Sequence, residues 1–216
     1  MKNFTVGQID IAVARKEYDD FKQKIESKTD LKEREDILSF LRDAKQLPFL
    51  IPSFLWQDWD LYAREKPIVD DFVTDLVVGK SKETKFILIE FENANKDSIF
   101  VQRKRNLKYW GDRFNDALGQ ITDWFWRIDE LTEYEKRKFF KIDSINYLDY
   151  EGLIIIGRDS YFDDEDDQRR LFWRARCTLI NSRPFRVMTY DTLLNKMGET
   201  LQTFENIKLI KEEQDS

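Results

Sequence analysis

The sequence predicts an α/β protein built on a mixed sheet. Along its 216 residues, segments with helical and strand periodicity occur in the order helix, strands, helix, strand, helix, strand, helix, which is typical of that class. The run Leu153–Gly157 is short and fully apolar, as expected for a strand buried on both faces of a mixed sheet. A hydrophobic content of 41% with 14% aromatic residues is enough to fill the core of one domain.

The N-terminal part of the chain is predicted to be helical. Apolar side chains recur at helical spacing from about residue 8 to residue 25, and a charged stretch, Glu26–Arg34, follows. A second helix is predicted over Glu35–Lys45, and Pro48 should end it. The aromatic, proline-broken stretch Phe49–Tyr62 is interpreted as an irregular segment packed on the core. We expect residues 1–32 to form an N-terminal helical arm and residues 33–216 to form the main domain.

Two strands joined by a short polar loop are predicted next. They cover Ile68–Val78 and Phe86–Glu92, with the loop at Gly79–Lys85. The remaining predicted elements follow in order: a long helix from near Arg113, the strand at Leu153–Gly157, a helix over Gln168–Ile180, a strand over Arg186–Tyr190 and a last helix that begins within Thr192–Met197.

Three carboxylates on these two strands are the candidate site. Asp75 lies within a run of apolar and β-branched residues, and Glu90 and Glu92 share one face of the second strand because side chains alternate with a period of two. Carboxylates on adjacent strands repel one another, which raises the pKa of each. A hard divalent cation relieves that repulsion, and oxygen ligands are those that Mg²⁺ (or Mn²⁺) prefers. The pattern predicts a metal site at Asp75, Glu90 and Glu92.

Gln120 is expected beside this site. It follows Ala117 by three residues and precedes Trp124 by four, so it lies on the flank of the apolar stripe of its helix, where it can position a water or a phosphate.

A structural alternative remains for the three carboxylates. Asp75 could cap a bulge or pair with an arginine, and Glu90 and Glu92 could lie on the solvated face of an edge strand.

Two residue counts restrict the chemistry. The chain has no histidine, which excludes serine and cysteine triads, zinc hydrolases with His ligands and His-metal nucleases. The single cysteine, Cys177, excludes an internal disulfide, fits a reducing cytoplasm and is expected to be a small buried residue. The first residues lack an apolar core, so no signal peptide is expected. The longest apolar stretch, Leu47–Trp56, is too short to span a membrane.

Although the net charge is −6, two regions of the sequence are basic. Gln168–Tyr190 contains six arginines and no acid, and Lys96–Arg113 contains six basic residues against two acids. These are candidate DNA contacts, with paired surface charges or an oligomer interface as the alternatives. The acidic run Asp163–Asp167 precedes a predicted helix, where it fits the positive end of the helix dipole better than a second metal site.

The order D…ExE…Q on strand, strand and helix resembles the PD-(D/E)xK nuclease fold. The wider pattern is similar to the Shedu family of bacterial anti-phage defence proteins, in its C-terminal nuclease domain, from about Glu33 to about Met197. This resemblance implies a restriction-endonuclease-like mixed sheet flanked by helices and a Mg²⁺-dependent DNA endonuclease, often a homo-oligomer. It assigns Asp75 and Glu90 as metal ligands and Gln120 as a supporting residue. The resembling segments are Phe72–Val78, Ile89–Glu92, Leu118–Trp124, Leu153–Arg158 and Val187–Leu194.

Two residues depart from the pattern. Thr74 stands where the superfamily name has proline, and Glu92 stands where the superfamily usually has lysine. Lys82, Lys85 and Lys96 are the candidates for the missing cation. The glutamate favours a second hypothesis, in which the domain senses DNA ends or a phage protein without cutting. A third is an assembly domain that uses the aromatic surface around residues 49–62 as its interface.

Overall fold

A computed structural model describes residues 3–55, 58–69, 72–103, 107–145 and 147–214. Seven of the described strands form one sheet in the order β1-β2-β3-β4-β7-β9-β8. The inner strands β4, β7 and β9 are parallel, and the remaining pairs are antiparallel. The predicted mixed sheet of an α/β protein is therefore confirmed. The strands are β1 (Thr5–Val6), β2 (Leu61–Ile68), β3 (Phe72–Lys80), β4 (Lys85–Phe91), β7 (Asp149–Ile155), β8 (Leu179–Ile180) and β9 (Arg183–Met188).

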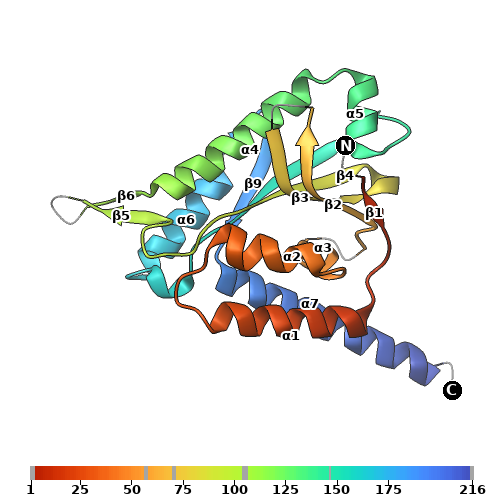
Figure 1. Ribbon diagram of the computed structural model, residues 1–216, viewed down its shortest axis with the longest axis horizontal. Helices are drawn as coiled ribbons and strands as arrows, with labels where there is room; N and C mark the ends of the chain where they lie inside the picture. The colour runs from red at the N-terminus through yellow and green to blue at the C-terminus, as the bar shows by residue number, and fades with distance from the viewer. Residues whose placement is uncertain (1–2, 56–57, 70–71, 104–106, 146, 215–216) are drawn as a thin grey trace.

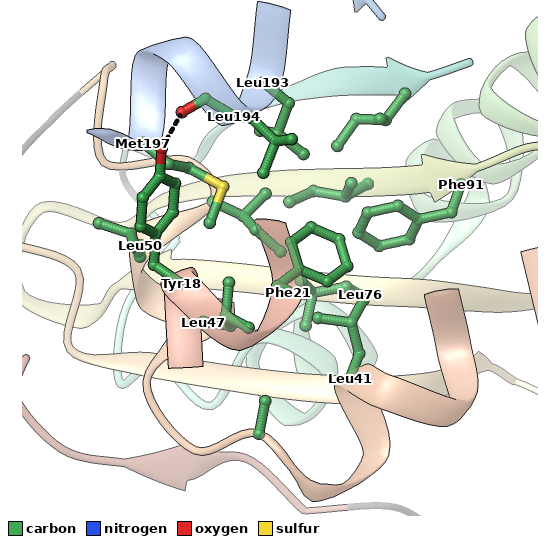
Figure 2. Packing of buried hydrophobic residues seen from close by; sticks show 14 of the residues in the cluster. Tyr18, Phe21, Leu41, Leu47, Leu50, Leu76, Phe91, Leu193, Leu194 and Met197 are labelled. Carbon is green, nitrogen blue, oxygen red and sulfur yellow. Dashed lines mark hydrogen bonds between the residues drawn. The ribbon is translucent and has the colours of Figure 1, made fainter. Parts of the chain in front are cut away.

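One face of the sheet is covered by helices from the two ends of the chain. α1 (Ile11–Glu26) and α7 (Tyr190–Gln214) lie side by side, together with the shorter α2 (Ser39–Asp43) and α3 (Leu47–Leu50) (Figure 1). Phe21 of α1 packs near Leu76 and Phe91 of the sheet, and the Tyr18 hydroxyl donates a hydrogen bond of 3.2 Å to the Leu194 carbonyl (Figure 2). α1 thus contributes to the core, and a domain boundary at residue 32 stays a prediction.

The opposite face is covered by α4 (Asp112–Glu130), α5 (Glu133–Phe140) and α6 (Glu165–Cys177). Side chains of the central strands alternate between the two cores: Leu76 and Ile89 face the first, whereas Val77 and Leu88 face the second. This is the two-residue period that the hairpin sequence predicts. A separate two-stranded ribbon, β5 (Phe100–Gln102) and β6 (Lys108–Trp110), projects from the body beside the start of α4 (Figure 1).

Several sequence predictions need correction. Glu35–Lys45 is not one α-helix: a π-helical segment over Glu33–Leu38 runs into α2. Pro48 lies in the first turn of α3 instead of ending a helix, a position where its missing N–H costs nothing. Part of the segment expected to be irregular is strand β2, and the predicted strand Ile68–Val78 includes residues 70–71, which lie outside the described residues.

β2 was not predicted because charged residues interrupt its alternation of apolar and polar side chains. In addition, Glu65 in β2 has a left-handed backbone with φ 42°. The β5–β6 ribbon and α5 were not predicted either. The aromatic residues Phe49, Trp59 and Tyr62 are buried in the first core, so they do not form the exposed interface expected of an assembly domain; Trp56 lies outside the described residues. Among the described residues, no helix is long and apolar enough to cross a membrane.

Candidate functional site

The site lies where β3 and β4 separate. The last paired residues of this antiparallel ladder are Leu76 and Ile89, so Asp75 and Glu90 are the next residues outward on neighbouring strands. The Asp75 carboxylate accepts the backbone N–H of Phe91 at 2.9 Å. A side chain of β3 therefore takes the hydrogen bond that a backbone carbonyl would accept in a continued ladder. The two carboxyl groups lie within hydrogen-bonding reach of each other.

Glu90 is held from the opposite side by Gln120. The Gln120 side-chain amide, on α4, donates a hydrogen bond of 2.6 Å to Glu90 Oε1, so it points toward Glu90 as its helical spacing predicts. Glu90 is buried, with 3% of its surface exposed, and its second oxygen, Oε2, has no hydrogen-bond partner in the described part of the chain. A buried acceptor without a partner is costly, and the Asp75 carboxyl group lies within reach of the same side chain.

Burial and mutual repulsion shift the proton equilibria of this pair. Burial raises the pKa of Asp75 to about 7, although the Phe91 N–H partly opposes the shift. Burial also raises the pKa of Glu90 well above its usual range, and the neighbouring charges of Asp75, Glu92 and Glu33 raise it further. Two such carboxyls titrate as a unit. Without a cation, the pair therefore holds at least one proton near neutral pH.

The Glu92 side chain lies beside a positively charged residue, Arg113. It follows the end of β4, is 2% exposed, and its Oε2 lies 3.7 Å from a terminal nitrogen (Nη1) of Arg113. The backbone of Glu92 is fixed by the Tyr190 hydroxyl, which donates 2.7 Å to its carbonyl. Burial and then the charge of Glu33 raise the pKa of the Glu92 carboxyl to about 7, and Arg113 opposes this. Glu92 is thus buried next to an arginine on the second core's helix.

The donor set that fits a divalent cation is the Asp75–Glu90 pair. Among the residues that the structure describes, no group of three or more His, Cys, Asp or Glu side chains is arranged to hold a metal ion. Asp75 and Glu90 converge, and the partnerless Glu90 Oε2 is an available oxygen ligand of the kind that Mg²⁺ prefers. Glu92 is turned toward Arg113, so its role as a third ligand stays a prediction.

A cleft of about 490 Å³ opens beside Glu92. It is lined by the turn of residues 30–35, by the side chains of Asn93 and Asn95, and by Arg113. The walls are fixed by backbone pairing, because Leu31 and Ala94 exchange hydrogen bonds of 2.8 and 2.9 Å. Asn93 in this lining directly follows Glu92, so the cleft lies next to the end of β4.

Two of the lysines proposed as the missing cation, Lys82 and Lys85, lie at the other end of β4 from Glu92. Lys85 begins β4, five residues before Glu90, and pairs with Glu83 of the adjoining turn, which also contains Lys82. Five strand residues span about 16 Å. The charge of Lys96 acts on Asp163. The cation that sequence reasoning missed is Arg113. One signal was available: Arg113 precedes Gln120 by seven residues, two helical turns, so the two share a helix face.

Five of the six arginines of residues 168–190 contact other side chains of the protein, and a role in DNA binding stays a prediction. Arg170 and Arg174 lie over the Trp110 ring at 5.0 and 4.6 Å and join the β5–β6 ribbon to α6. Three others form ion pairs: Arg169 with Asp166, Arg183 with Asp129 and Arg186 with Glu151. Residues 104–106 of the other basic region lie outside the described residues.

Two further expectations concern α6. Asp164 caps the helix, accepting the N–H groups of Asp166 and Asp167, which agrees with the structural interpretation of the acidic run. Cys177, at the other end of the helix, is exposed, so the prediction that it is buried is wrong. It occupies the last residue of α6, where the helix leaves the core, and its size alone does not determine burial there.

Together, the mixed sheet and the helices on both faces define a restriction-endonuclease-like fold. The chain belongs to the Shedu family: the family described as the C-terminal domain of the Shedu protein SduA matches residues 14–194. Membership implies a role in anti-phage defence. A search of curated proteins found no match.

Proposed function

We propose that this protein is a metal-dependent DNA endonuclease that hydrolyses phosphodiester bonds with Mg²⁺ or Mn²⁺. The observation that carries the proposal is the buried Asp75–Glu90 pair, in which Glu90 Oε2 has no hydrogen-bond partner among the described residues while Gln120 fixes Oε1 at 2.6 Å. Such a pair is costly to fold, and a fold maintains it for a ligand that neutralises it. Family membership supports the choice of DNA as the substrate.

The residues have distinct roles in this proposal. Asp75 and Glu90 would hold the cation, which supplies charge stabilisation at a phosphoryl oxygen and a more acidic water. Gln120 fixes the orientation of Glu90. Glu92, beside Arg113 at the end of β4, is suited to accept a proton from the attacking water. We further propose that the protein acts in the cytoplasm and that it forms a homo-oligomer. Sedimentation that shows a monomer at micromolar concentration would contradict the homo-oligomer.

The alternative is a DNA- or phage-protein-sensing module that does not cut. Two observations favour it: glutamate replaces the superfamily lysine at position 92, and no three-ligand group is arranged for a metal among the described residues. DNA binding without cleavage in the assay below would support this alternative.

The test is cleavage of supercoiled, linear and single-stranded DNA with Mg²⁺ and with Mn²⁺. Wild type, Glu90→Ala and Glu130→Ala are compared, since Glu130 is an exposed glutamate at the end of α4 and its loss controls for charge. The proposal expects cleavage by wild type and Glu130→Ala and none by Glu90→Ala. A wild type that cuts no form with either cation contradicts it.

A further inference from the structure

We propose that Arg113 is the phosphate-binding cation of the Asp75–Glu90 site, in place of the lysine of the superfamily pattern. The inference rests on the proposed function, and it assigns a residue that neither the sequence pattern nor family membership identifies. Arg113 lies beside Glu92 with Nη1 at 3.7 Å from Oε2, and Glu92 occupies the lysine position of the pattern. The positive charge is therefore supplied from α4 instead of β4.

The position of Arg113 is fixed relative to Glu92. The Gly111 N–H donates to the Ile99 carbonyl at 2.8 Å, and the Phe114 N–H donates to the Ser98 carbonyl at 3.2 Å. The buried Ser98 hydroxyl in turn donates 2.8 Å to the Asn93 carbonyl, directly after Glu92. A Cβ at Gly111 would lie 2.4 Å from the Asp97 carbonyl oxygen, so glycine is required for this close approach. The start of α4 and the end of β4 are therefore one rigid unit.

The guanidinium retains donors for a ligand. At 3.7 Å its contact with Glu92 is an ion pair, longer than a hydrogen bond, and a guanidinium carries five N–H donors. The side chain of Arg113 is 51% exposed and lines the cleft with Asn93 and Asn95. A planar, bidentate cation in a solvent-reachable cleft is suited to a phosphodiester oxygen pair.

Arg113 and Gln120 form two contacts from one helix face. Gln120 contacts Glu90, and Arg113 contacts Glu92. Two residues of α4 that are seven apart in the sequence therefore contact two glutamates that are two apart at the end of β4. A phosphate between the cation-binding pair and the cleft would meet Arg113. In this position the arginine compensates the negative charge that develops on the transferred phosphoryl group.

The experiment compares Arg113→Ala and Arg113→Lys with Arg137→Ala, an exposed arginine of α5, in the full chain. We expect kcat for DNA cleavage to fall about a hundredfold in Arg113→Ala, with a smaller change in KM and a partial recovery in Arg113→Lys. Added millimolar guanidinium should restore part of kcat in Arg113→Ala and leave wild type and Arg137→Ala unchanged. A purely structural role would not respond to guanidinium. Wild-type kcat in Arg113→Ala, or a loss that guanidinium does not rescue, overturns the inference.

A binding measurement separates this inference from the proposed function. Fluorescence anisotropy of a labelled duplex oligonucleotide is measured with Ca²⁺ over a range of salt concentrations. Loss of one phosphate contact should reduce the slope of log affinity against log salt by about 1 in Arg113→Ala and not in Arg137→Ala. An unchanged slope overturns the Arg113 inference even if wild type cleaves DNA. The expected slope change without cleavage overturns only the proposed function, and a wild type that binds no duplex overturns both.

Discussion

Gln120 donates its side-chain amide to Glu90 Oε1 at 2.6 Å across the gap between α4 and β4. This contact fixes one oxygen of a buried carboxyl and leaves the other, Oε2, without a partner in the described part of the chain. A supporting residue of this kind typically changes metal affinity or activity by about 10–100-fold when it is replaced.

Gln120→Ala should therefore weaken metal-dependent cleavage more than it weakens the fold. We expect the Mg²⁺ concentration for half-maximal cleavage to rise by about tenfold or more, with a loss of about 1 kcal/mol in unfolding free energy from the lost hydrogen bond. A Mg²⁺ titration of the cleavage rate measures the first and urea unfolding the second. An unchanged Mg²⁺ dependence would show that Gln120 only packs against the strand. Asn115→Ala, at another exposed position of α4, is the matched control.

Metal-free stability should fall as pH rises through the acidic to neutral range. The folded-state pKa values of Asp75 and Glu92 are about 7, above the unfolded values of 3.8 and 4.5. The folded protein therefore holds more protons than the unfolded chain between about pH 4 and pH 7, and stability is lost across that interval. Because each unit of raised pKa corresponds to about 1.4 kcal/mol, we expect a loss of several kcal/mol, measured by urea unfolding at several pH values in a chelator. Glu92→Gln should reduce the loss because one of the two titrating carboxyls is gone; an equal loss in this variant would place its origin elsewhere.

A divalent cation should stabilise the folded protein by mass action. At a hundredfold excess over its dissociation constant, a ligand that binds only the folded state adds about 2.7 kcal/mol. Mg²⁺ or Mn²⁺ should therefore raise the Tm of wild type and of Glu130→Ala, and leave Glu90→Ala unshifted. If Glu90→Ala instead fails to fold without metal, Glu90 is a structural residue and the site assignment is wrong.

Lys66 gives a prediction away from the site. It is 2% exposed, and its ammonium lies 4.5 and 5.2 Å from the centres of the Phe4 and Phe139 rings. Burial lowers the pKa of Lys66 from 10.5 to about 8. The unfolded chain holds more protons between these values, so the contribution of Lys66 to stability rises with pH from about 8 to about 10.5.

Lys66→Met should remove this pH dependence, because methionine does not titrate. Urea unfolding measures how much the stability of each protein changes between pH 7 and pH 10. An equal change in wild type and Lys66→Met would show that Lys66 is not its origin; Lys138→Met, exposed on α5, is the control.

Strand periodicity was sufficient to place the two central strands and the positions of Asp75 and Glu90. The alternation of Leu76, Val77, Leu88 and Ile89 between two cores follows directly from it. The helical spacing around Gln120 likewise predicted the direction of its side chain. Local patterns were sufficient here because each residue's neighbours on the same element set its face.

The parts that sequence reasoning missed depend on contacts between distant segments. Arg113 lies beside Glu92 because Gly111 permits the backbone of α4 to approach residues 97–98, which no local period reveals. β2 escaped because it carries charged residues, among them Glu65 with a positive φ. Glu92 lies one residue beyond the end of β4 and beside Arg113, and its role as a third ligand stays a prediction.

Direct binding of Mn²⁺ is the measurement that tests the central claim, that Asp75 and Glu90 form a divalent-cation site. Electron paramagnetic resonance of free Mn²⁺ is followed as wild type, Asp75→Asn, Glu90→Gln and Glu130→Gln are titrated into it. We expect wild type and Glu130→Gln each to bind Mn²⁺ at one site. In Asp75→Asn and in Glu90→Gln, the Mn²⁺ affinity of that site should fall by at least about tenfold. Equal Mn²⁺ affinity in all four proteins, with each variant folded, would contradict it.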